Sequence, residues 1–321
     1  MNTKKILLFL FLTLCSFRWG GNTAFALTLP FTQNGIVYNK AHNPNHGTNF
    51  KDLLEVVGFV SNELVDKTNV TIPNTVKING KNYTVYGVCL DHNYEVCSTI
   101  ETIKLPESVT YFRLYDPAGT HSFTNRSNQE VTYYDHSKGV VKLPNLQFFY
   151  VDSKNTSLKV WQNKLLLSHD GTKLICCPPA AKSGNVVFNG IKSFGPYAFF
   201  GCGLTKLVIP ASLETIDETA FCGFSGLTEF LNADYQRPGS SATNKKFVAK
   251  DGILFEMRQD DAGNYTKYKS LLCFPDNKNA GSKLTYNLGG GGSLLNIAHY
   301  AFDDVKGLTT LYIGNCDGFG K

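Results

Sequence analysis

Residues 191–230 contain the same pattern twice, and this repeat constrains the fold more than any other feature of the sequence. Ala198-Phe199 recurs as Ala220-Phe221 after 22 residues, and Leu204 recurs as Leu227 after 23 residues. A unit of this length is too short to bury a core by itself, so it must pack its apolar face against its neighbours. A period of 22–23 residues is therefore typical of a solenoid, and it predicts a repeat fold rather than a compact enzyme fold.

The end of each unit follows a second rule, in which an apolar residue is followed by apolar residues three and five positions later. Four complete sets obey it: Ile100/Ile103/Leu105, Leu146/Phe149/Val151, Leu204/Leu207/Ile209 and Leu308/Leu311/Ile313. A fifth set begins with Leu227 and Phe230, but Asn232 takes its last place. Because side chains two residues apart in a strand point to the same face, each set predicts a short strand with an inward apolar side. Pro106 and Pro210 follow two of the sets and end those strands, since proline offers no amide donor.

Two segments between the repeats, near residues 152–179 and 247–276, each contain two apolar runs joined by a polar link. This pattern predicts a β-hairpin in each segment, and Asp170-Gly171 is a strong turn signal in the first. Residues 112–140 and 234–246 are rich in Ser, Asn, Gly and Lys and lack an apolar period, so we expect surface loops there.

The first 26 residues are expected to be a secretion signal. Lys4 and Lys5 precede the apolar run Ile6–Phe17, and Ala24-Phe25-Ala26 is a cleavage site of the A-x-A type. The apolar run is too short to span a membrane. We therefore expect an exported protein that is extracellular, attached to the cell surface or periplasmic.

Loss of this signal removes Lys4, Lys5 and Arg18 and lowers the formal net charge from +5 to about +2. A charge this small does not indicate a nucleic acid or an anionic membrane as a partner. No transmembrane segment is expected in the rest of the chain.

Eight cysteines remain after the signal: Cys89, Cys97, Cys176, Cys177, Cys202, Cys222, Cys273 and Cys316. Cys202 and Cys222 lie inside the repeats beside core positions, where a free cysteine behaves as a small hydrophobe. Cys89 and Cys97 are close together in an irregular stretch and are the best candidates for a disulfide in an exported chain. Cys176 and Cys177 should point to opposite faces of a strand, so they cannot form an ordinary metal site together.

The sequence predicts no catalytic residue, no cofactor-binding residue and no metal ligand. His42 and His46 have the spacing of a helical metal pair, but Pro44 between them argues against a helix. The run Gly289–Gly292 is not followed by Gly-Lys-Ser/Thr, so it is a flexible connector rather than a phosphate-binding loop. An active site assembled from distant residues has no support in the sequence.

The residues between the inward positions should form an outward strip on the stacked strands. These candidate binding residues are Thr102, Lys104, Phe148, Tyr150, Lys206, Val208, Glu229, Leu231, Thr310 and Tyr312. Exposed Phe and Tyr on a rigid surface are typical of contact sites for proteins or glycans. For Phe148 two alternatives stay open, exposure or cover by the hairpin near 160–177, whereas Tyr312 is expected to be exposed.

These patterns resemble the BspA-like leucine-rich repeat proteins, whose units run roughly I-x-x-I-x-x-x-A-F-x-x-C-x-x-L-x-x-V-x-I-P. Ile191–Pro210 and Leu213–Phe230 follow this pattern closely, and Ile297–Ile313 follows it with Asp303-Asp304-Val305 at the small and Cys positions. The resemblance covers most of residues 34–315 and extends to the N-terminal cap of secreted Bacteroidetes members, although residues 112–140 lack a recognisable repeat.

The expected fold is a leucine-rich-repeat-like solenoid, β-rich with short strands, turns and short helical segments, and with β-hairpin insertions. Its expected divisions are a signal peptide (1–26), an N-terminal β cap region (27–66) and the repeat solenoid (67–321). The resemblance implies a secreted or cell-surface, non-enzymatic module for protein binding or adhesion, because the family shares no catalytic residues.

Two functional alternatives remain. A carbohydrate-binding surface or periplasmic protein would stack Phe148, Tyr150 and Tyr312 on sugars, while an exported hydrolase is suggested only by the compartment. The last apolar set is followed by eight residues without a polar cap. We therefore expect this end to pair with another chain or a second copy, or the natural protein to continue further.

Overall fold

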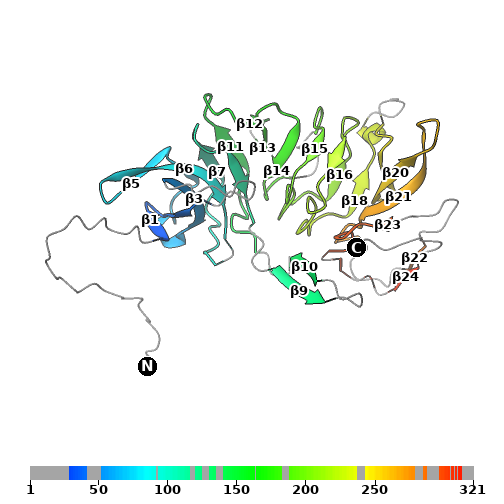
Figure 1. Ribbon diagram of the computed structural model, residues 1–321, viewed down its shortest axis with the longest axis horizontal. Coiled ribbons are helices and arrows are strands. Elements are labelled where there is room, and N and C mark those ends of the chain that lie inside the picture. Colours follow the sequence, from blue (N-terminus) through cyan, green and yellow to red (C-terminus); the bar gives the residue numbers. More distant parts are fainter. Residues whose placement is uncertain are drawn as a thin grey trace, which may run out of the picture.

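Almost all the regular structure of the protein is β. The computed structural model describes residues 29–41, 52–91, 93–115, 120–124, 130–134, 140–162, 164–182, 188–236, 243–278, 285–287, 296–303, 305–306, 308 and 310–312. Figure 1 shows that the strands follow one another along the long axis of the molecule, from β1 at one end to β20 and β21 at the other. Within these residues there is no α-helix, so the helical segments expected from the sequence are reduced to the 3-10 turns η1 (Ser61–Glu63) and η3 (Ala233–Gln236).

A six-stranded sheet begins the fold, with the order β1-β2-β3-β6-β5 and with β8 paired to β6. Its strands are β1 (Phe31–Gln33), β2 (Ile36–Lys40), β3 (Leu53–Phe59), β5 (Thr75–Ile78), β6 (Lys81–Cys89) and β8 (Tyr111–Arg113). The sheet contains two antiparallel hairpins, β1–β2 with its turn at Asn34-Gly35 and β5–β6 with its turn at Asn79-Gly80. All four of these turn residues have positive φ. Asn-Gly suits this turn because both residues adopt the left-handed conformation more easily than others do.

The next element is a ladder of three parallel strands, in the order β11-β7-β4. The strands are β4 (Asn69–Thr71), β7 (Thr102–Leu105) and β11 (Phe148–Val151). Val70, Ile103 and Phe149 align across the ladder and are all buried, with Ile103 and Phe149 at 0% exposure. The alternation of apolar and polar residues in these segments therefore places one side of the ladder in the core, as the sequence predicts.

Consecutive repeats lie side by side in residues 172–231. One parallel ladder contains β14 (Lys173–Cys176), β15 (Ser193–Phe194) and β17 (Thr215–Ile216), and another contains β16 (Lys206–Val208) and β18 (Glu229–Leu231). Ser193 pairs with Thr215 and Lys206 pairs with Glu229, so the offset between paired strands equals the sequence period. The turns pair as well, because the Gly201 amide donates to the Gly223 carbonyl at 2.9 Å.

Phenylalanines fill the space between these repeats. Phe199 is fully buried and stacks on Phe221 and Phe224 at centroid distances of 5.5 and 5.2 Å. Phe194 meets the Phe199 ring edge-on at 5.0 Å, and Phe230 meets Phe221 in the same way at 5.2 Å. Contacts of this kind add roughly 0.5–1.5 kcal/mol per pair beyond the burial of the rings. Each repeat therefore supplies the core of its neighbour.

Two antiparallel hairpin modules interrupt the parallel ladders. The first is formed by β12 (Leu158–Trp161), β13 (Leu165–Ser168) and β14, and the second by β19 (Phe247–Lys250), β20 (Ile253–Gln259) and β21 (Tyr265–Cys273). The last strand of each module continues into a parallel pair, β14 with β15 and β21 with β23 (Asn296–Ile297). Further along the chain, β22 (Thr285–Asn287) pairs in parallel with β24 (Thr310–Tyr312).

A buried asparagine begins each hairpin module. Asn155 donates from Nδ2 to the carbonyls of Pro106 (2.7 Å) and Val109 (2.8 Å), and its Oδ1 accepts the amides of Ser157 and Leu158. Asn244 makes the equivalent bonds, with Pro210, Leu213, Lys246 and Phe247 as partners. Each side chain thus satisfies four backbone groups and attaches the module to the proline turn of a preceding strand.

One sequence expectation is wrong. Residues 112–140, expected to be a surface loop, contain β8 and an antiparallel hairpin of β9 (Thr120–Thr124) and β10 (Glu130–Tyr134), in which alternation is hidden by the polar composition. The sequence left open whether Cys89 and Cys97 form a disulfide, and in the structure both are free thiols. Cys97 is 1% exposed in the core and its amide bonds the Lys142 carbonyl, whereas Cys89 pairs with Arg113.

The other cysteines agree with the sequence prediction. Cys176 packs in the first core cluster and Cys177 in the second, which places them on opposite faces. Cys177 contacts Cys202 of the next repeat with a distance of 3.2 Å between the two Sγ atoms. Burial raises the pKa of both Cys176 and Cys177 well above that of an ordinary thiol, so these groups stay protonated and act as apolar packing.

Gly223 tests the stacking of repeats. It has φ +69, and an added Cβ would lie 2.5 Å from Cδ2 of Phe200 in the preceding repeat. We expect Gly223→Ala to lower the free energy of unfolding by about 3 kcal/mol, measured by urea denaturation. Gly263→Ala is the matched control, because Gly263 has φ +80 but no atom within 4 Å of the added Cβ. If both variants lose the same free energy of unfolding, the contact with Phe200 of the preceding repeat is not what destabilises Gly223→Ala.

Asn155 tests the attachment of the hairpin module. Asn155→Ala removes four hydrogen bonds at a site that is 2% exposed, and the abandoned backbone groups cannot reach water. We expect the variant to lose about 3 kcal/mol of stability in thermal or urea denaturation. The exposed Asn264→Ala should change stability by less than about 0.5 kcal/mol. A loss at Asn155 no larger than this control would contradict the role of the side chain.

Candidate functional site

The structure distributes the ten predicted strip residues over three separate strand groups. In register, Thr102 pairs with Phe148, Lys104 with Tyr150, Lys206 with Glu229, Val208 with Leu231, Thr285 with Thr310, and Asn287 with Tyr312. Among the described strands, no backbone pairing joins β7–β11, β16–β18 and β22–β24 into one sheet. Strip residues therefore align with one another within β7–β11 and within β16–β18, whereas Thr310 and Tyr312 align with β22, which was not part of the expected strip.

The outward side of the β4–β7–β11 ladder carries the best candidate surface. Tyr150 is 50% exposed, and the Lys104 ammonium lies 5.9 Å from the centre of its ring. This is the geometry of a cation–π contact, which holds both side chains upright on the sheet. Thr71 of β4 aligns with Lys104 and extends the row by one strand. The sequence analysis did not include it among the strip residues, although the apolar residues of Val70–Pro73 have the same spacing as a strand set.

Thr102 and Phe148 are less accessible than an outward position suggests. Thr102 is only 6% exposed, which contradicts its expected place on the open surface. The reason is the central position of β7, because the larger side chains of Asn69 and Phe148 flank Thr102 in register on both sides. Phe148 itself is half-buried, so its two alternatives are resolved as partial cover.

A hollow of about 430 Å³ lies at the carboxyl ends of the same three strands. Its walls are Thr71–Asn74, Lys104–Pro106 and Tyr150–Asp152, one segment from each strand. Tyr150 supplies an aromatic face, while Lys104 and Asp152 supply one charge of each sign. An aromatic ring beside a few polar groups in a concave surface is the usual composition of a contact site.

The β16–β18 group has fewer side chains available to bind a ligand. Lys206 and Glu229 form an exposed ion pair at 2.5 Å, so each charge is largely satisfied by the other. Val208 and Leu231 are half-buried. Asn232, which replaces the expected apolar residue, accepts the Ala249 amide at 2.8 Å and donates to the Ala249 carbonyl at 2.9 Å. These two hydrogen bonds hold the second hairpin module beside β18, so the β16–β18 group borders that module.

For Thr310 and Tyr312 the structure gives the backbone pairing with β22, and their side chains lie outside the described residues. The uncapped end expected after Ile313 also lies outside them, as do His42 and His46. In the part of the chain that is described, no group of three or more His, Cys, Asp or Glu side chains is arranged to hold a metal ion. The same residues include no helix long and apolar enough to cross a membrane.

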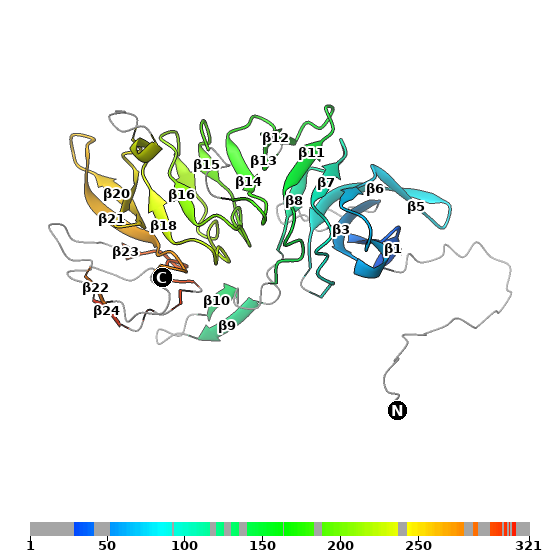
Figure 2. The same ribbon diagram turned by 180° about the vertical axis from the view of Figure 1, so that it is seen from behind.

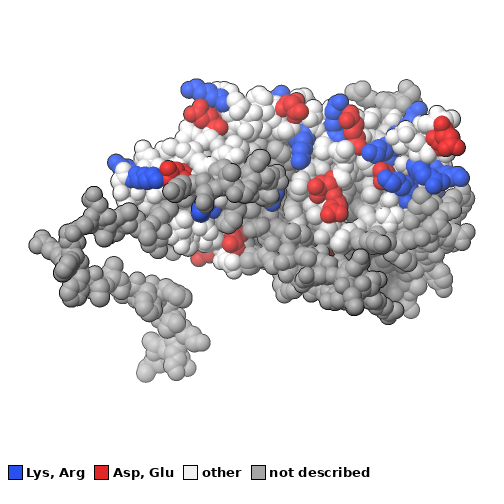
Figure 3. Space-filling view, in the orientation of Figure 1, with Lys and Arg blue, Asp and Glu red and all other residues white. Residues whose placement is uncertain are grey.

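The charges visible on one side of the molecule are mixed. Figure 3 shows basic and acidic side chains interspersed along the row of strands, without a continuous patch of either sign. The ion pairs Lys192–Glu214 and Lys206–Glu229 contribute to this mixture. On this side of the described residues there is no basic stripe of the kind that marks many nucleic-acid-binding surfaces.

Comparison with known proteins places the repeats in a family. Residues 184–237 match the model described as "BspA type Leucine rich repeat region (6 copies)". The chain contains BspA-type leucine-rich repeats. The matched residues are those in which the structure shows paired strands one period apart and phenylalanines stacked between repeats. The β-rich, leucine-rich-repeat-like fold and the resemblance predicted from the sequence are both confirmed. No curated sequence matches the chain significantly.

Several solved structures are distantly similar. A leucine rich cell surface protein from Faecalibacterium prausnitzii shares 14% identity with a TM-score of 0.31, covering 89% of this chain and 71% of its own. The pneumococcal vaccine antigen PcpA shares 14% identity with a TM-score of 0.32, covering 88% and 64%. A leucine-rich repeat protein from Bacteroides ovatus shares 16% identity with a TM-score of 0.33, covering 89% and 71%. These similarities are too distant to assign a ligand or an activity.

Proposed function

We propose that the protein is an exported or cell-surface, non-enzymatic adhesion module that binds a protein ligand on the outward side of the β4–β7–β11 ladder. The observation that carries this proposal is Tyr150, which is 50% exposed and stands beside Lys104 at a hollow of about 430 Å³. Aromatic residues that are already ordered lose little conformational entropy on binding, which is why they dominate protein contact sites.

The repeat architecture supports a large ligand. We infer that the ladders belong to one solenoid over residues 67–321, preceded by a cap region at 27–66 and interrupted by the modules near 152–179 and 247–276. A solenoid presents a long rigid surface, which suits a macromolecule better than a small metabolite. Leucine-rich repeats are accordingly consistent with protein binding. The distant relative from Faecalibacterium is described as a cell surface protein, which agrees with the same location for this chain.

A glycan is the second candidate ligand for this surface. The half-exposed ring of Tyr150 adjoins the polar side chains of Asn74 and Asp152 in one hollow, and aromatic rings stack on sugar faces. A glycan array probed with the mature protein and with Tyr150→Ala separates the two candidates, because only an array signal that depends on Tyr150 comes from the ladder. Self-association through the last repeat stays a prediction, to be checked by the molar mass of the protein in solution.

Substitutions on the ladder test the proposal after a pull-down from host and bacterial surface extracts has supplied a partner. We expect Tyr150→Ala to weaken its binding about tenfold, with a smaller loss for Lys104→Ala, its cation–π partner on the same ladder. Because Tyr150 is half-exposed, its removal should leave the unfolding transition nearly unchanged. Titration calorimetry measures the affinity. Tyr265→Ala, on the distant strand β21, is the control and should bind like the wild type. Unaltered binding by both ladder variants would remove this surface from consideration.

A further inference from the structure

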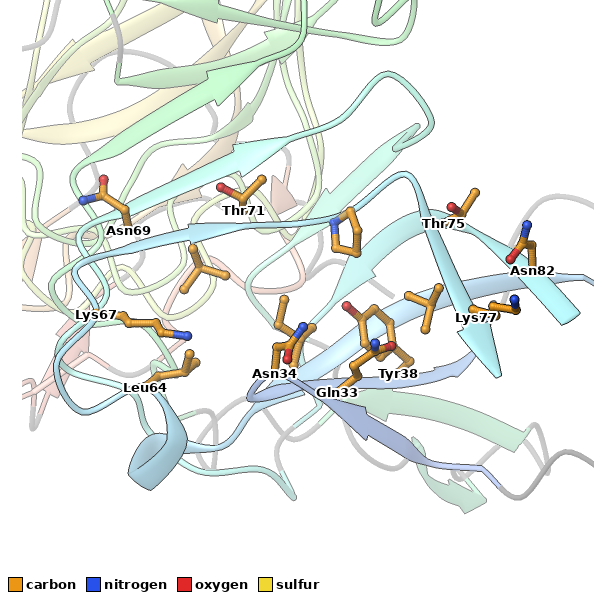
Figure 4. Close-up of a pocket in the computed structure, with 14 residues that line it drawn as sticks. Gln33, Asn34, Tyr38, Leu64, Lys67, Asn69, Thr71, Thr75, Lys77 and Asn82 are labelled. Carbon is orange, nitrogen blue, oxygen red and sulfur yellow. The ribbon is translucent and has the colours of Figure 1, made fainter. Parts of the chain in front are cut away.

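A second pocket, on the other side of β4 from the ladder hollow, has a different chemistry. Figure 4 shows it between the β1–β2 hairpin, the loop after η1, and strands β4 and β5. Its volume is about 400 Å³, within the ~300–1,000 Å³ range of sites for small ligands. Thr71 and Pro73 line both hollows, so β4 is their common wall.

The walls of this pocket are rich in groups that both donate and accept hydrogen bonds. Four carboxamides and two hydroxyls line it, from Gln33, Asn34, Asn69, Asn82, Thr71 and Thr75. A carboxamide offers a carbonyl acceptor and two N–H donors, and a hydroxyl offers both roles. A ligand with several hydroxyl groups satisfies such walls, because each hydroxyl also donates and accepts hydrogen bonds.

The charge of the pocket has one sign. Lys67 and Lys77 are the charged residues among the 14 that line it, and no carboxylate is among them. In Figure 4, Lys67 extends its ammonium toward Asn34 and Tyr38. Nearby acids do not line the pocket: Glu63 and Asp66 are exposed beside it in sequence, and Asp52 pairs with Lys81. An anionic ligand should therefore bind this pocket more tightly than a neutral or cationic one.

The floor of the pocket is preorganised. Tyr38 is 1% exposed, and burial raises the pKa of its hydroxyl to about 12, so it remains a neutral donor at physiological pH. Asn34 is held in the left-handed conformation at φ 52 by the hairpin turn. The next residue, Gly35, has no room for a side chain, since an added Cβ would lie 2.8 Å from Cγ of Leu64. A backbone fixed in this way loses little entropy when the pocket binds a ligand.

We propose that this pocket binds a carboxylated sugar, with Lys67 attracting the carboxylate, the charge of Lys77 at the opposite end of the pocket adding to the attraction, and the carboxamides bonding the ring hydroxyls. The uronic acids and N-acetylneuraminic acid share this chemistry. The site uses different side chains from those proposed to contact a protein on the ladder, apart from the shared wall at Thr71 and Pro73. Either proposal can therefore fail without the other.

Titration of the mature protein with single sugars tests this inference, with saturation-transfer NMR to detect binding and calorimetry to measure it. The probes are glucuronic acid, N-acetylneuraminic acid, glucose and acetate. We expect at least one carboxylated sugar to bind ten times more tightly than glucose and acetate. A preference for glucuronic acid indicates a uronic-acid polymer as the natural source, and a preference for N-acetylneuraminic acid indicates a sialylated glycan.

Substitutions show whether the sugar binds in this pocket and distinguish the pocket from the ladder surface. Lys67→Gln and Lys77→Gln should each weaken the carboxylated sugar at least fivefold, with unchanged circular dichroism and unfolding temperature because both lysines are exposed. Lys159→Gln, an exposed lysine on β12, and Tyr150→Ala should bind the sugar like the wild type. The proposal is overturned if no carboxylated sugar binds, if acetate binds as tightly as the sugar acids, or if both pocket variants retain full affinity.

Discussion

The structure depends on one constraint, which is that a single repeat cannot bury its own apolar face. Phe199 illustrates the solution, because its ring stacks on Phe221 and Phe224 of the next repeat in addition to meeting Phe194 of its own repeat. The stacking fixes the register at one period, and the parallel pairing of Lys206 with Glu229 follows from it. Once the register is fixed, strand parity decides which side chains face outward. The scaffold and the binding surfaces are thus set by the same packing.

Much of this arrangement follows from local sequence. The period, the inward positions Ile103 and Phe149 and the opposite orientation of Cys176 and Cys177 all depend on spacing within one strand or one repeat. Relations between distant segments were harder to predict. Thr102 is outward by parity yet buried, because its cover comes from neighbouring strands. The division of the strip into three groups arises from the hairpin modules, whose lateral position no periodicity encodes.

The pocket beside β4 could not have been predicted from the sequence for the same reason. Asn34, Lys67 and Lys77 lie in turns and edge segments that have no apolar period, and each of them alone is an ordinary surface residue. They line one pocket because the N-terminal sheet lies beside the ladder, and the reverse view in Figure 2 shows β3 and β6 next to β7. The distinctive chemistry of the chain is therefore concentrated near its N-terminal sheet, where the repeats begin. The later repeats, with paired charges such as Lys206–Glu229, serve mainly as scaffold.

The register of consecutive repeats is the claim on which the rest depends, and cysteine cross-linking tests it most directly. Lys206 and Glu229 are paired across β16 and β18, where parallel strands lie about 4.8 Å apart, within the separation that a disulfide can span. The double variant Lys206→Cys/Glu229→Cys should form a disulfide on mild oxidation, identified by peptide mapping. Lys206→Cys/Leu231→Cys lies on the same face but two residues out of register, and it should remain reduced. A disulfide in the second variant but not in the first would contradict the stacking that this structure shows.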